Sequence, residues 1–501
     1  MNGPAKVVEI LSGTGQPEKL SIAGYPLEYW TEKFELPVHI YYAPVIRANL
    51  RAFKAVFAQY YPKGRVCFAA KACTHQSTLK IVKEEGCGCD VASYNETRCA
   101  FEAGVAPEML DLNGNCKEDF YIEDAIRRGM NIVADNIEEF EIVAQIASRL
   151  QKRPKVLLRV SGFELDGVTD DSVFTAGTWT KFGAQIQHVP AFIKTLDQYP
   201  QIEFMGFHAH IGSQIAQLAP FQAVLGKFIE LGQQLNKALA GRGGKCQILN
   251  IGGGFPVRYV EKEVWSNIVK RIHDGYLQAQ KGDMSQVFVW HDGLAGFAGE
   301  GDTRIHLDRW TGERFYTEYP KESMLAALLK SEIVVNGKSV NSVRALKDLG
   351  EPMLTIEPGR SVAEDAGVTL AKVGLVRCVA GQHNLMALEM GVTNHGESLI
   401  EKPVKKWEIA NAYHKKDVEL FECFVAGNLC FSGDMLSKYK VFLQRRPVRG
   451  DVILIHNTGA YTSSLLTACS NSFPRPARVL VGDGGEITFI KKRDRYEEIF
   501  N

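Results

Sequence analysis

Short apolar stretches alternate with amphipathic helical patterns along most of the first 360 residues. Eight of these stretches are short enough for buried strands, and they lie near residues 65–70, 89–92, 109–113, 131–135, 155–160, 203–209, 246–251 and 353–357. Helical patterns separate most of them, including those at residues 77–85, 118–128, 137–149 and 221–240. Eight βα units in succession are typical of a (β/α)8 TIM barrel, and an open doubly wound sheet is the only serious alternative. We therefore expect an α/β protein whose barrel spans residues 46–360.

Beyond residue 360 the pattern changes to extended runs punctuated by glycine. These runs lie at residues 369–379, 385–390, 417–425, 451–455 and 477–481. They predict a C-terminal, mainly antiparallel β-domain over residues 361–501. A further extended apolar stretch at residues 37–42 suggests that the N-terminal segment, residues 1–45, completes this domain.

The seventh and eighth apolar stretches are much farther apart in the sequence than the others. About 100 residues separate them, which is far more than a βα unit needs, so we predict an insertion at about residues 257–350. Between Trp290 and Tyr319 it is rich in glycine, aromatic and acidic residues. Such a segment could be a lid, a substrate-selecting flap or an oligomer contact, and a structural insertion without a chemical role is an equal alternative. A helical pattern at residues 321–331 then predicts a helix over the eighth strand.

The balance of charged residues argues against some kinds of binding partner. The chain has 58 basic and 58 acidic residues, so no basic excess is available for nucleic acid or an anionic membrane. No apolar run reaches membrane-spanning length, and the first residues lack the layout of a signal peptide. The 11 cysteines are irregularly placed, and we expect reduced thiols in a cytoplasmic protein. Cys87 and Cys89 have no matching second pair or histidine spacing, so no metal site is predicted.

Polar residues follow the predicted strands, where barrels carry their active sites. They include Lys71, Asp90, Ser93, Asn115, Lys117, Asp135, Arg159, His208, His210, Ser213, Glu357 and Arg360. Lys71 follows the first apolar run, and apolar walls beside its amine would lower the ammonium pKa, which suits a Schiff-base nucleophile. The common alternative is a lysine that leaves its strand and is solvated.

Two further features suggest chemistry. Gly252, Gly253 and Gly254 follow the seventh strand, in a region where barrels commonly bind phosphate through backbone N–H groups, although tight turns also use glycine. Cys430 lies in a short polar loop of the β-domain, residues 430–434. It could be a reactive thiol or an inert, half-buried cysteine.

The motifs occur in a specific order. Lys71 is followed by HIGSQ at 210–214, GGG at 252–254, EPGR at 357–360, Cys430, and GAY at 459–461. This set resembles the fold-type III pyridoxal-phosphate decarboxylases, the group that contains diaminopimelate and ornithine decarboxylases. The resemblance runs from about residue 40 to 490, and HIGSQ, EPGR and the cysteine loop favour this group over the alanine racemases.

The resemblance implies pyridoxal 5'-phosphate as cofactor and a role for each motif residue. Lys71 would form a Schiff base with the cofactor, Glu357 would hydrogen-bond its pyridine nitrogen, and His210 would stack on its ring. The phosphate and the rest of the cofactor would be held by Ser213, Gly253, Gly254, Gly359, Arg360 and Tyr461. Asp90 and Arg159 would lie near the ring or near Lys71.

The same resemblance implies decarboxylation of an amino acid through a quinonoid intermediate. Cys430 would return a proton to the α-carbon, and it would reach the site from the partner subunit of a homodimer. Two alternatives remain at this point: an amino-acid racemase or epimerase that uses Lys71 and Cys430 as opposed acid–base groups, and a non-catalytic cofactor-binding protein. Retention of Cys430 and of the whole β-domain argues against the second.

The chain departs from the family pattern where the substrate's far end would bind. The residue after the cysteine is glutamate in diaminopimelate decarboxylases and aspartate in ornithine decarboxylases, but it is Phe431 here. Residues 391–400 also lack the arginine and tyrosine that handle the distal carboxylate. We therefore expect a substrate other than diaminopimelate, with Arg360, Phe431 and Asp434 as candidate contacts and possible further contacts from the insertion.

Overall fold

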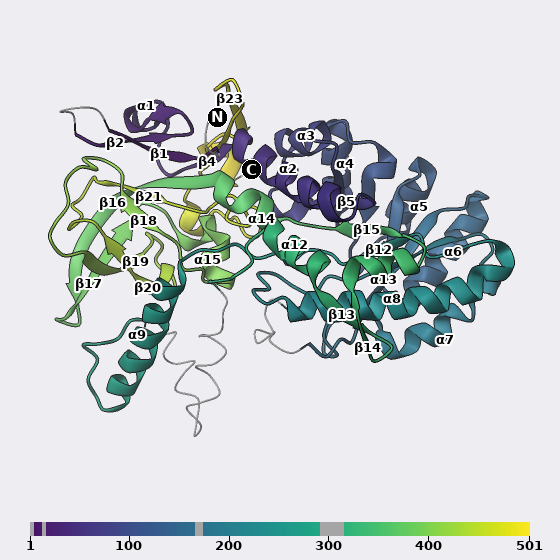
Figure 1. Ribbon diagram of the computed structural model, residues 1–501. Helices are drawn as coiled ribbons and strands as arrows, with labels where there is room; N and C mark the ends of the chain where they lie inside the picture. The colour runs from purple at the N-terminus through teal and green to yellow at the C-terminus, as the bar shows by residue number, and fades with distance from the viewer. Residues whose placement is uncertain (1–4, 13–16, 166–173, 291–314, 501) are drawn as a thin grey trace. The chain divides into compact units, whose positions relative to one another are not determined.

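The computed structural model describes residues 5–12, 17–165, 174–290 and 315–500 (Figure 1). It divides into two compact units. One, which we call the barrel unit, comprises Asn49–Val257 and Thr317–Val362. The other, which we call the β unit, comprises Met1–Ala48, Arg258–Tyr316 and Ala363–Asn501.

The barrel unit is built on eight parallel strands. In sequence order they are β5 (Gly64–Ala69), β6 (Gly88–Val91), β7 (Leu110–Leu112), β8 (Asn131–Ala134), β9 (Lys155–Ser161), β11 (Glu203–His208), β12 (Ile248–Asn250) and β15 (Met353–Ile356). Each pairs with the next, and β15 pairs with β5, so the sheet is closed. All eight predicted strands and the barrel are therefore confirmed, and the open doubly wound sheet is wrong.

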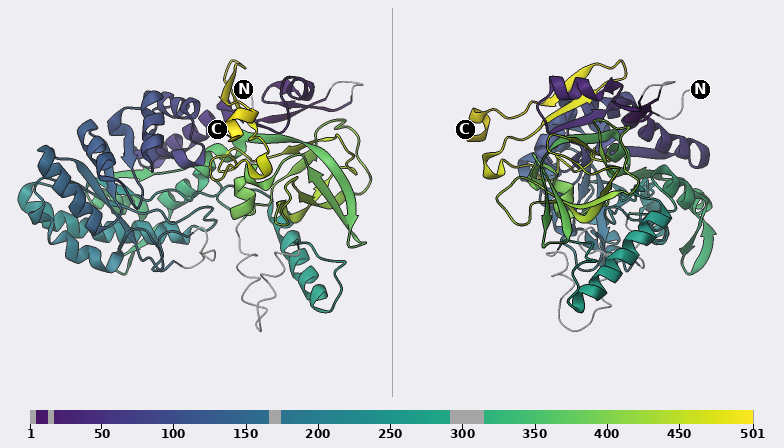
Figure 2. Two further views of the ribbon diagram at one scale, coloured as in Figure 1. Left: turned by 180° about the vertical axis from the view of Figure 1, so that it is seen from behind. Right: turned by 90° about the vertical axis from the view of Figure 1, so that its left-hand side faces the viewer.

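Helices form the layer outside the strands (Figure 2). The α-helices are α2 (Ala43–Tyr60), which leads into β5, followed by α3 (Gln76–Glu84), α4 (Tyr94–Glu102), α5 (Asp119–Arg128), α6 (Ile137–Leu150), α7 (Val189–Ile193), α8 (Ala219–Leu239), α12 (Glu322–Lys330), α13 (Ser342–Asp348) and α14 (Arg360–Ala363). A hairpin, β13 (Glu332–Val335) with β14 (Lys338–Asn341), and the short strand β10 (Ala184–Gln185) complete the unit, with 3-10 turns between elements. The helices predicted at 77–85, 118–128, 137–149, 221–240 and 321–331 are confirmed within two residues at each end.

Helix α6 shows how local sequence fixes an element of the barrel. Asn136 caps its start by accepting the Glu139 N–H at 2.8 Å. Phe140, Val143 and Ala147 recur at helical spacing, and all three are buried. One apolar face therefore holds α6 against the sheet and sets where its first turn lies.

The β unit is a mixed, mainly antiparallel sheet domain organised around the 13-residue strand β16 (Gly367–Val379). The first half of β16 pairs with β4 (Val38–Tyr42) and β21 (Val452–Ile455), and the second half pairs with β17 (His383–Leu388). The remaining strands are β18 (Trp407–Ile409), β19 (Phe421–Ala426), β20 (Met435–Leu443), β22 (Ala477–Val481) and β23 (Ile487–Lys491). Strand β4 lies between β16 and β22, so the N-terminal segment contributes a strand to the sheet.

The rest of the β unit is smaller. It comprises a sheet of β1 (Val8–Leu11), β2 (Lys19–Ile22) and β3 (Tyr25–Pro26), and the helices α1 (Leu27–Lys33), α9 (Lys262–Gln280), α15 (Gly396–Ile400) and α16 (Tyr496–Phe500). Helix α9 belongs to the predicted insertion and contacts the β-domain through an Arg271–Glu422 ion pair of 2.6 Å. Most of the glycine-rich and aromatic stretch of the insertion, including Trp310, lies outside the described residues.

No helix in the described part of the chain is both long enough and apolar enough to cross a membrane.

A buried charge cluster joins four segments of the β unit. Lys405 donates to Glu364 at 2.9 Å and also contacts Glu397 and the Asn457 carbonyl. The Tyr259 hydroxyl lies within hydrogen-bonding distance of both carboxylates, at 3.0 and 3.1 Å, and shares its single proton between them. Burial opposes the Lys405 charge, but the two carboxylates outweigh it and raise the Lys405 pKa. The cluster is therefore ionised, and its members hold one another in place.

Replacing Lys405 with methionine tests this cluster. The variant removes the Lys405 cation from two buried carboxylates, and the loss of one partner of a buried ion pair typically costs about 3–5 kcal/mol of unfolding free energy. Urea denaturation of Lys405→Met measures it. Lys406→Met is the matched control, because the Lys406 side chain is 62% exposed and its pairing with Glu408 should contribute less than about 1 kcal/mol. Equal losses in the two variants would contradict the assignment.

Candidate active site

Lys71 lies at the carboxyl end of β5, in the 3-10 turn Ala70–Ala72. It is half-buried between two buried alanines. The turn after β15 packs against this point: a Cβ on Gly359 would lie 2.9 Å from the Ala72 Cβ and 3.0 Å from the Ala69 Cβ. Only glycine fits there, so the EPGR motif is held directly against the strand that carries Lys71.

Glu357 is a buried carboxylate at the end of β15, and three side chains from other strands converge on it. Asn250 donates to its Oε1 at 2.7 Å and Asn113 at 3.2 Å, while His208 Nε2 lies 3.2 Å from its Oε2. Burial raises the pKa of Glu357, but the contact with His208 and the charge of Lys71 outweigh it and hold the pKa well below its usual range. Glu357 is therefore an ionised acceptor in a buried site.

Asp90, at the end of β6, is the second carboxylate of this site. Its Oδ1 accepts a hydrogen bond from Asn113 Nδ2 at 2.6 Å. Burial first, and then the charge of Glu357, raise the Asp90 pKa, while Lys71 opposes them. The two carboxyl groups therefore differ: Glu357 is ionised and Asp90 tends to keep its proton. Asn113 donates to both and links them.

His210 follows β11 and is kept neutral. Burial, Lys71 and Arg159 lower its pKa well below the ordinary value. Its Nδ1 accepts the Gly253 N–H at 3.1 Å, so in the neutral ring the proton is on Nε2. A neutral imidazole held in one orientation can pack against a flat aromatic ring.

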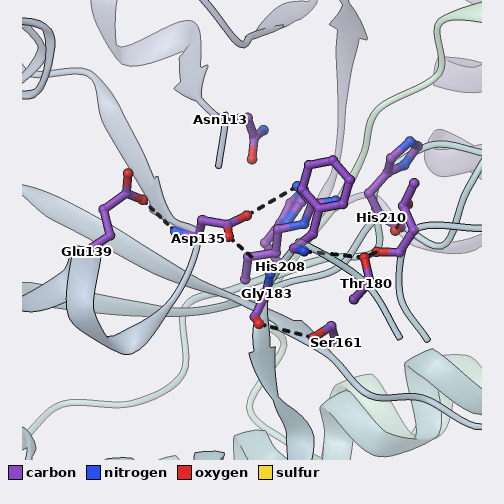
Figure 3. Close-up of polar contacts among 12 residues, drawn as sticks. Asn113, Asp135, Glu139, Ser161, Thr180, Gly183, His208 and His210 are labelled. Carbon is purple, nitrogen blue, oxygen red and sulfur yellow. Dashed lines mark hydrogen bonds and ion pairs between the residues drawn. The ribbon is translucent and has the colours of Figure 1, made fainter. Parts of the chain in front are cut away.

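A second group of charged residues surrounds Asp135 at the ends of β8 and β9 (Figure 3). Asp135 accepts from Arg159 at 3.4 Å and from the Gly183 N–H at 3.1 Å. Glu139 accepts the Asp135 N–H at 2.7 Å and the Lys117 ammonium at 2.6 Å. The Arg159 guanidinium also lies 4.2 Å from the centre of the Phe182 ring. Asp135 and the Phe182 ring therefore hold the Arg159 guanidinium between them.

The loop after β12 has the shape of an anion cradle. Gly252 and Gly254 have φ of 68° and 93°, and a Cβ on Gly253 would lie 2.5 Å from the Glu357 carbonyl oxygen. Nearby, Arg360 donates to Ser213 Oγ through Nε at 3.2 Å and Nη2 at 3.1 Å. A buried guanidinium, a hydroxyl and a side-chain-free loop fit a phosphate group. Together with Lys71, Glu357 and His210, they fit pyridoxal phosphate.

Sequence reasoning named most of this site but missed three members. Asn113, Asn250 and Glu139 were not singled out as site residues. Asn113 and Asn250 stand at the ends of apolar runs, where an amide also marks an ordinary strand end. Glu139 could have been found as the third residue after the helix cap Asn136, since an acid there often bonds back to the preceding backbone.

The remaining predicted site residues belong to the β unit. Cys430 and Phe431 are exposed, and the Cys430 N–H donates to Asn471 Oδ1 at 3.0 Å. Asp434 is buried, and Tyr461 has a left-handed φ of 58°. The roles expected of these four residues stay predictions. Among the described side chains, no group of three or more His, Cys, Asp or Glu is arranged for a metal ion.

Residues 45–287 match the family described as pyridoxal-dependent decarboxylase, pyridoxal binding domain. Among curated proteins, diaminopimelate decarboxylase of Bacillus subtilis (strain 168) is 27% identical over 495 residues, which are 98% of this chain and 97% of that protein. The Staphylococcus aureus (strain COL) protein of the same name is also 27% identical, over 97% of this chain and 98% of its own length. The predicted cofactor is thereby confirmed.

Solved structures share the fold. Diaminopimelate decarboxylase from M. jannaschii in co-complex with L-lysine has a TM-score of 0.75 at 22% identity, covering 99% of this chain and 96% of its own. Lysine/ornithine decarboxylase of Vibrio vulnificus complexed with putrescine has a TM-score of 0.63 at 20% identity, covering 92% and 98%. These similarities support a barrel followed by a β-domain.

The variant Asn113→Leu tests the link between the two carboxylates. It removes the hydrogen bonds to Asp90 and Glu357 at similar volume, and the bond to the ionised Glu357 alone contributes roughly 1.5–3 kcal/mol. We expect lower stability and an affinity for pyridoxal phosphate at least tenfold weaker, measured by titration of the cofactor-free protein. Asn131→Leu is the control, because Asn131 is also buried and bonds Asp111 at 2.9 Å, among the strands but in a different network. Unchanged cofactor affinity in Asn113→Leu would contradict the prediction.

Proposed function

This chain belongs to the fold-type III family of pyridoxal-phosphate-dependent decarboxylases, and we propose that it decarboxylates an amino acid other than diaminopimelate. The observation that carries the chemistry is the placement of Lys71 and an ionised, buried Glu357 at the ends of the neighbouring strands β5 and β15. The observation that supports a different substrate concerns the two positions expected to bind the far end of diaminopimelate, Phe431 and the segment 391–400. Neither presents an exposed charged side chain.

Different residues of the barrel unit would bind different parts of the cofactor. Bound pyridoxal phosphate supplies an aldehyde that condenses with amines and an aromatic ring that accepts electrons. Lys71 would hold the aldehyde until an amino acid replaces it. Glu357 would keep a proton on the ring nitrogen, because its lowered pKa keeps it ionised and its negative charge stabilises the protonated nitrogen. His210 would pack on the ring face, and Arg360, Ser213 and the glycine loop would bind the phosphate.

The β unit would supply the proton that replaces the lost carboxylate. Cys430 is exposed in the loop that follows β19, so its thiol is presented outward. We propose that the protein is a homodimer and that Cys430 of one subunit donates this proton at the α-carbon in the partner's site. A thiol is a suitable donor because it is weakly acidic and its conjugate base is stable.

The proposed choice of substrate rests on the side chains at the two positions expected near the far end of the substrate. Phe431 is 57% exposed, and it replaces the acid that would pair with a distal ammonium. In the segment 391–400, His395 and Glu397 are buried, and Glu397 is neutralised by Lys405. Neither position therefore offers a charge to the far end of diaminopimelate. An amino acid with an apolar or differently charged side chain fits better.

A panel of amino acids assayed for carbon dioxide release tests the reaction and the substrate together. We expect turnover of at least one amino acid, with kcat/KM for meso-diaminopimelate at least tenfold lower, since each missing charge contact costs roughly 1–3 kcal/mol. Diaminopimelate as the best substrate would overturn the specificity proposal. Loss of optical rotation without release of carbon dioxide would instead indicate a racemase.

The variant Lys71→Ala tests the cofactor attachment. It should abolish the visible absorbance of the Schiff base, because Lys71 is the amine that we expect to form it. Lys181→Ala is the control, because the Lys181 ammonium lies 5.0 Å from the centre of the Phe182 ring, which packs on Arg159. This variant should keep the absorbance band. A band that persists in Lys71→Ala would exclude Lys71 as the anchor.

The variant Cys430→Ala tests the proton donor and the shared site. We expect kcat to fall about 100-fold or more while the cofactor absorbance is unchanged. If sites are shared, mixing inactive Lys71→Ala with inactive Cys430→Ala should restore about a quarter of the activity, because half of the dimers are mixed and each has one intact site. Wild-type turnover by Cys430→Ala would remove the thiol from the mechanism.

A further inference from the structure

The loop that carries Cys430 and Phe431 is organised by one carboxylate. This loop, residues 427–434, joins β19 to β20, and Asp434 at its end is 3% exposed. Asp434 Oδ2 accepts the Leu429 N–H at 2.7 Å, inside the loop. Asp434 Oδ1 accepts the Val392 N–H at 2.6 Å, from the segment 391–400. One side chain therefore holds two separate stretches of backbone.

Two glycines make room for this arrangement. A Cβ on Gly427 would lie 2.3 and 2.5 Å from the two Asp434 carboxylate oxygens. A Cβ on Gly391 would lie 2.6–2.9 Å from the Leu429 side chain. Neither distance is possible for real atoms without displacement, so a side chain at Gly427 would displace the Asp434 carboxylate and one at Gly391 would displace the Leu429 side chain.

The backbone of the loop closes on the same residue. The Gly427 N–H donates to the Asp434 carbonyl at 2.8 Å, and the Asp434 N–H donates to the Phe431 carbonyl at 3.0 Å. Within the described part of the chain, no lysine, arginine or histidine forms an ion pair with Asp434. Its carboxylate is turned inward onto N–H groups, so it is not open to a substrate ammonium.

We propose that Asp434 is a positioning residue that ties the Cys430–Phe431 loop to the substrate-selecting segment 391–400. The proposal rests on the proposed function, because it concerns the proton donor and the residues expected near the far end of the substrate. The tie makes the two act as one body: a shift of the segment 391–400 moves the thiol, and the reverse. Choice of substrate and the rate of proton return are thereby coupled.

Amide hydrogen exchange and turnover together test the tie. In Asp434→Asn an NH2 group replaces one of the two carboxylate oxygens. This group cannot accept a hydrogen bond, so either the Val392 or the Leu429 N–H loses its acceptor and faces another donor. We expect exchange of the Val392 and Leu429 amides to accelerate at least tenfold together, followed peptide by peptide by mass spectrometry. We expect kcat on the best substrate to fall at least tenfold, cofactor affinity to stay within twofold, and the kcat/KM ratio between two substrates to shift at least threefold.

Two further variants separate positioning from a general loss of stability. Gly427→Ala leaves the carboxylate in the sequence but displaces it, so it should reproduce the changes of Asp434→Asn. Asp451→Asn is the matched control, because Asp451 is 4% exposed and accepts the Val448 N–H at 2.8 Å in a different loop. It should lower the melting temperature comparably and leave Val392 exchange, kcat and substrate preference unchanged.

Several outcomes would overturn the proposal. They are unchanged exchange of the Val392 amide in Asp434→Asn, acceleration at Leu429 alone, or an equal loss of kcat in Asp451→Asn. Exchange decides whether the tie exists even if no amino acid is turned over. A protein with the tie but without turnover would contradict the proposed function only, so the two failures are distinguishable.

Discussion

An ionised carboxylate buried at the end of β15 is the interaction on which the barrel site depends. Removing such a charge from water is costly unless donors surround it, and Glu357 has Asn250, Asn113 and His208 within hydrogen-bonding distance. These donors come from three other strands, so they meet only when the sheet is closed. The buried charge therefore favours closure of the barrel, and the closed barrel in turn fixes the position of the carboxylate. The contacts that stabilise the fold are the ones that would orient Glu357 in the proposed function.

The β unit uses the same physics for a different purpose. Lys405 is buried among Glu364, Glu397 and the Asn457 carbonyl, and Asp434 is buried among backbone N–H groups. In both cases a single charge fixes several loops, because leaving it without partners would cost more than ordering them. Glu397, the acidic residue of the segment 391–400, is engaged in this way by Lys405. Its charge is therefore turned toward the fold, in agreement with the proposed choice of substrate.

The sequence predicted the barrel well because parallel strands are covered on both faces and read as continuous apolar runs. The strand ends followed directly, and with them Lys71, Asp90, His210 and Glu357. The β-domain was harder: β20 was missed because Lys438 and Lys440 interrupt its apolar pattern, yet both are buried, and Lys440 pairs with Glu422 at 2.8 Å. Asn113 and Asn250 were missed because their importance comes from a carboxylate more than 100 residues away. Pairing partners that distant leave no local trace in the sequence.

Strand β4 is translated long before the strands that it pairs with. It leaves the ribosome before every strand of the barrel, but its neighbours are β16 and β22, and β22 ends at Val481. At 5–20 residues per second, roughly 20–90 s pass between the translation of β4 and that of its last partner. All strands of the barrel are complete in that interval, while an apolar strand waits with open edges. Nascent chains should therefore be most prone to aggregation, and most dependent on chaperones, in the period after the barrel has formed and before β22 arrives.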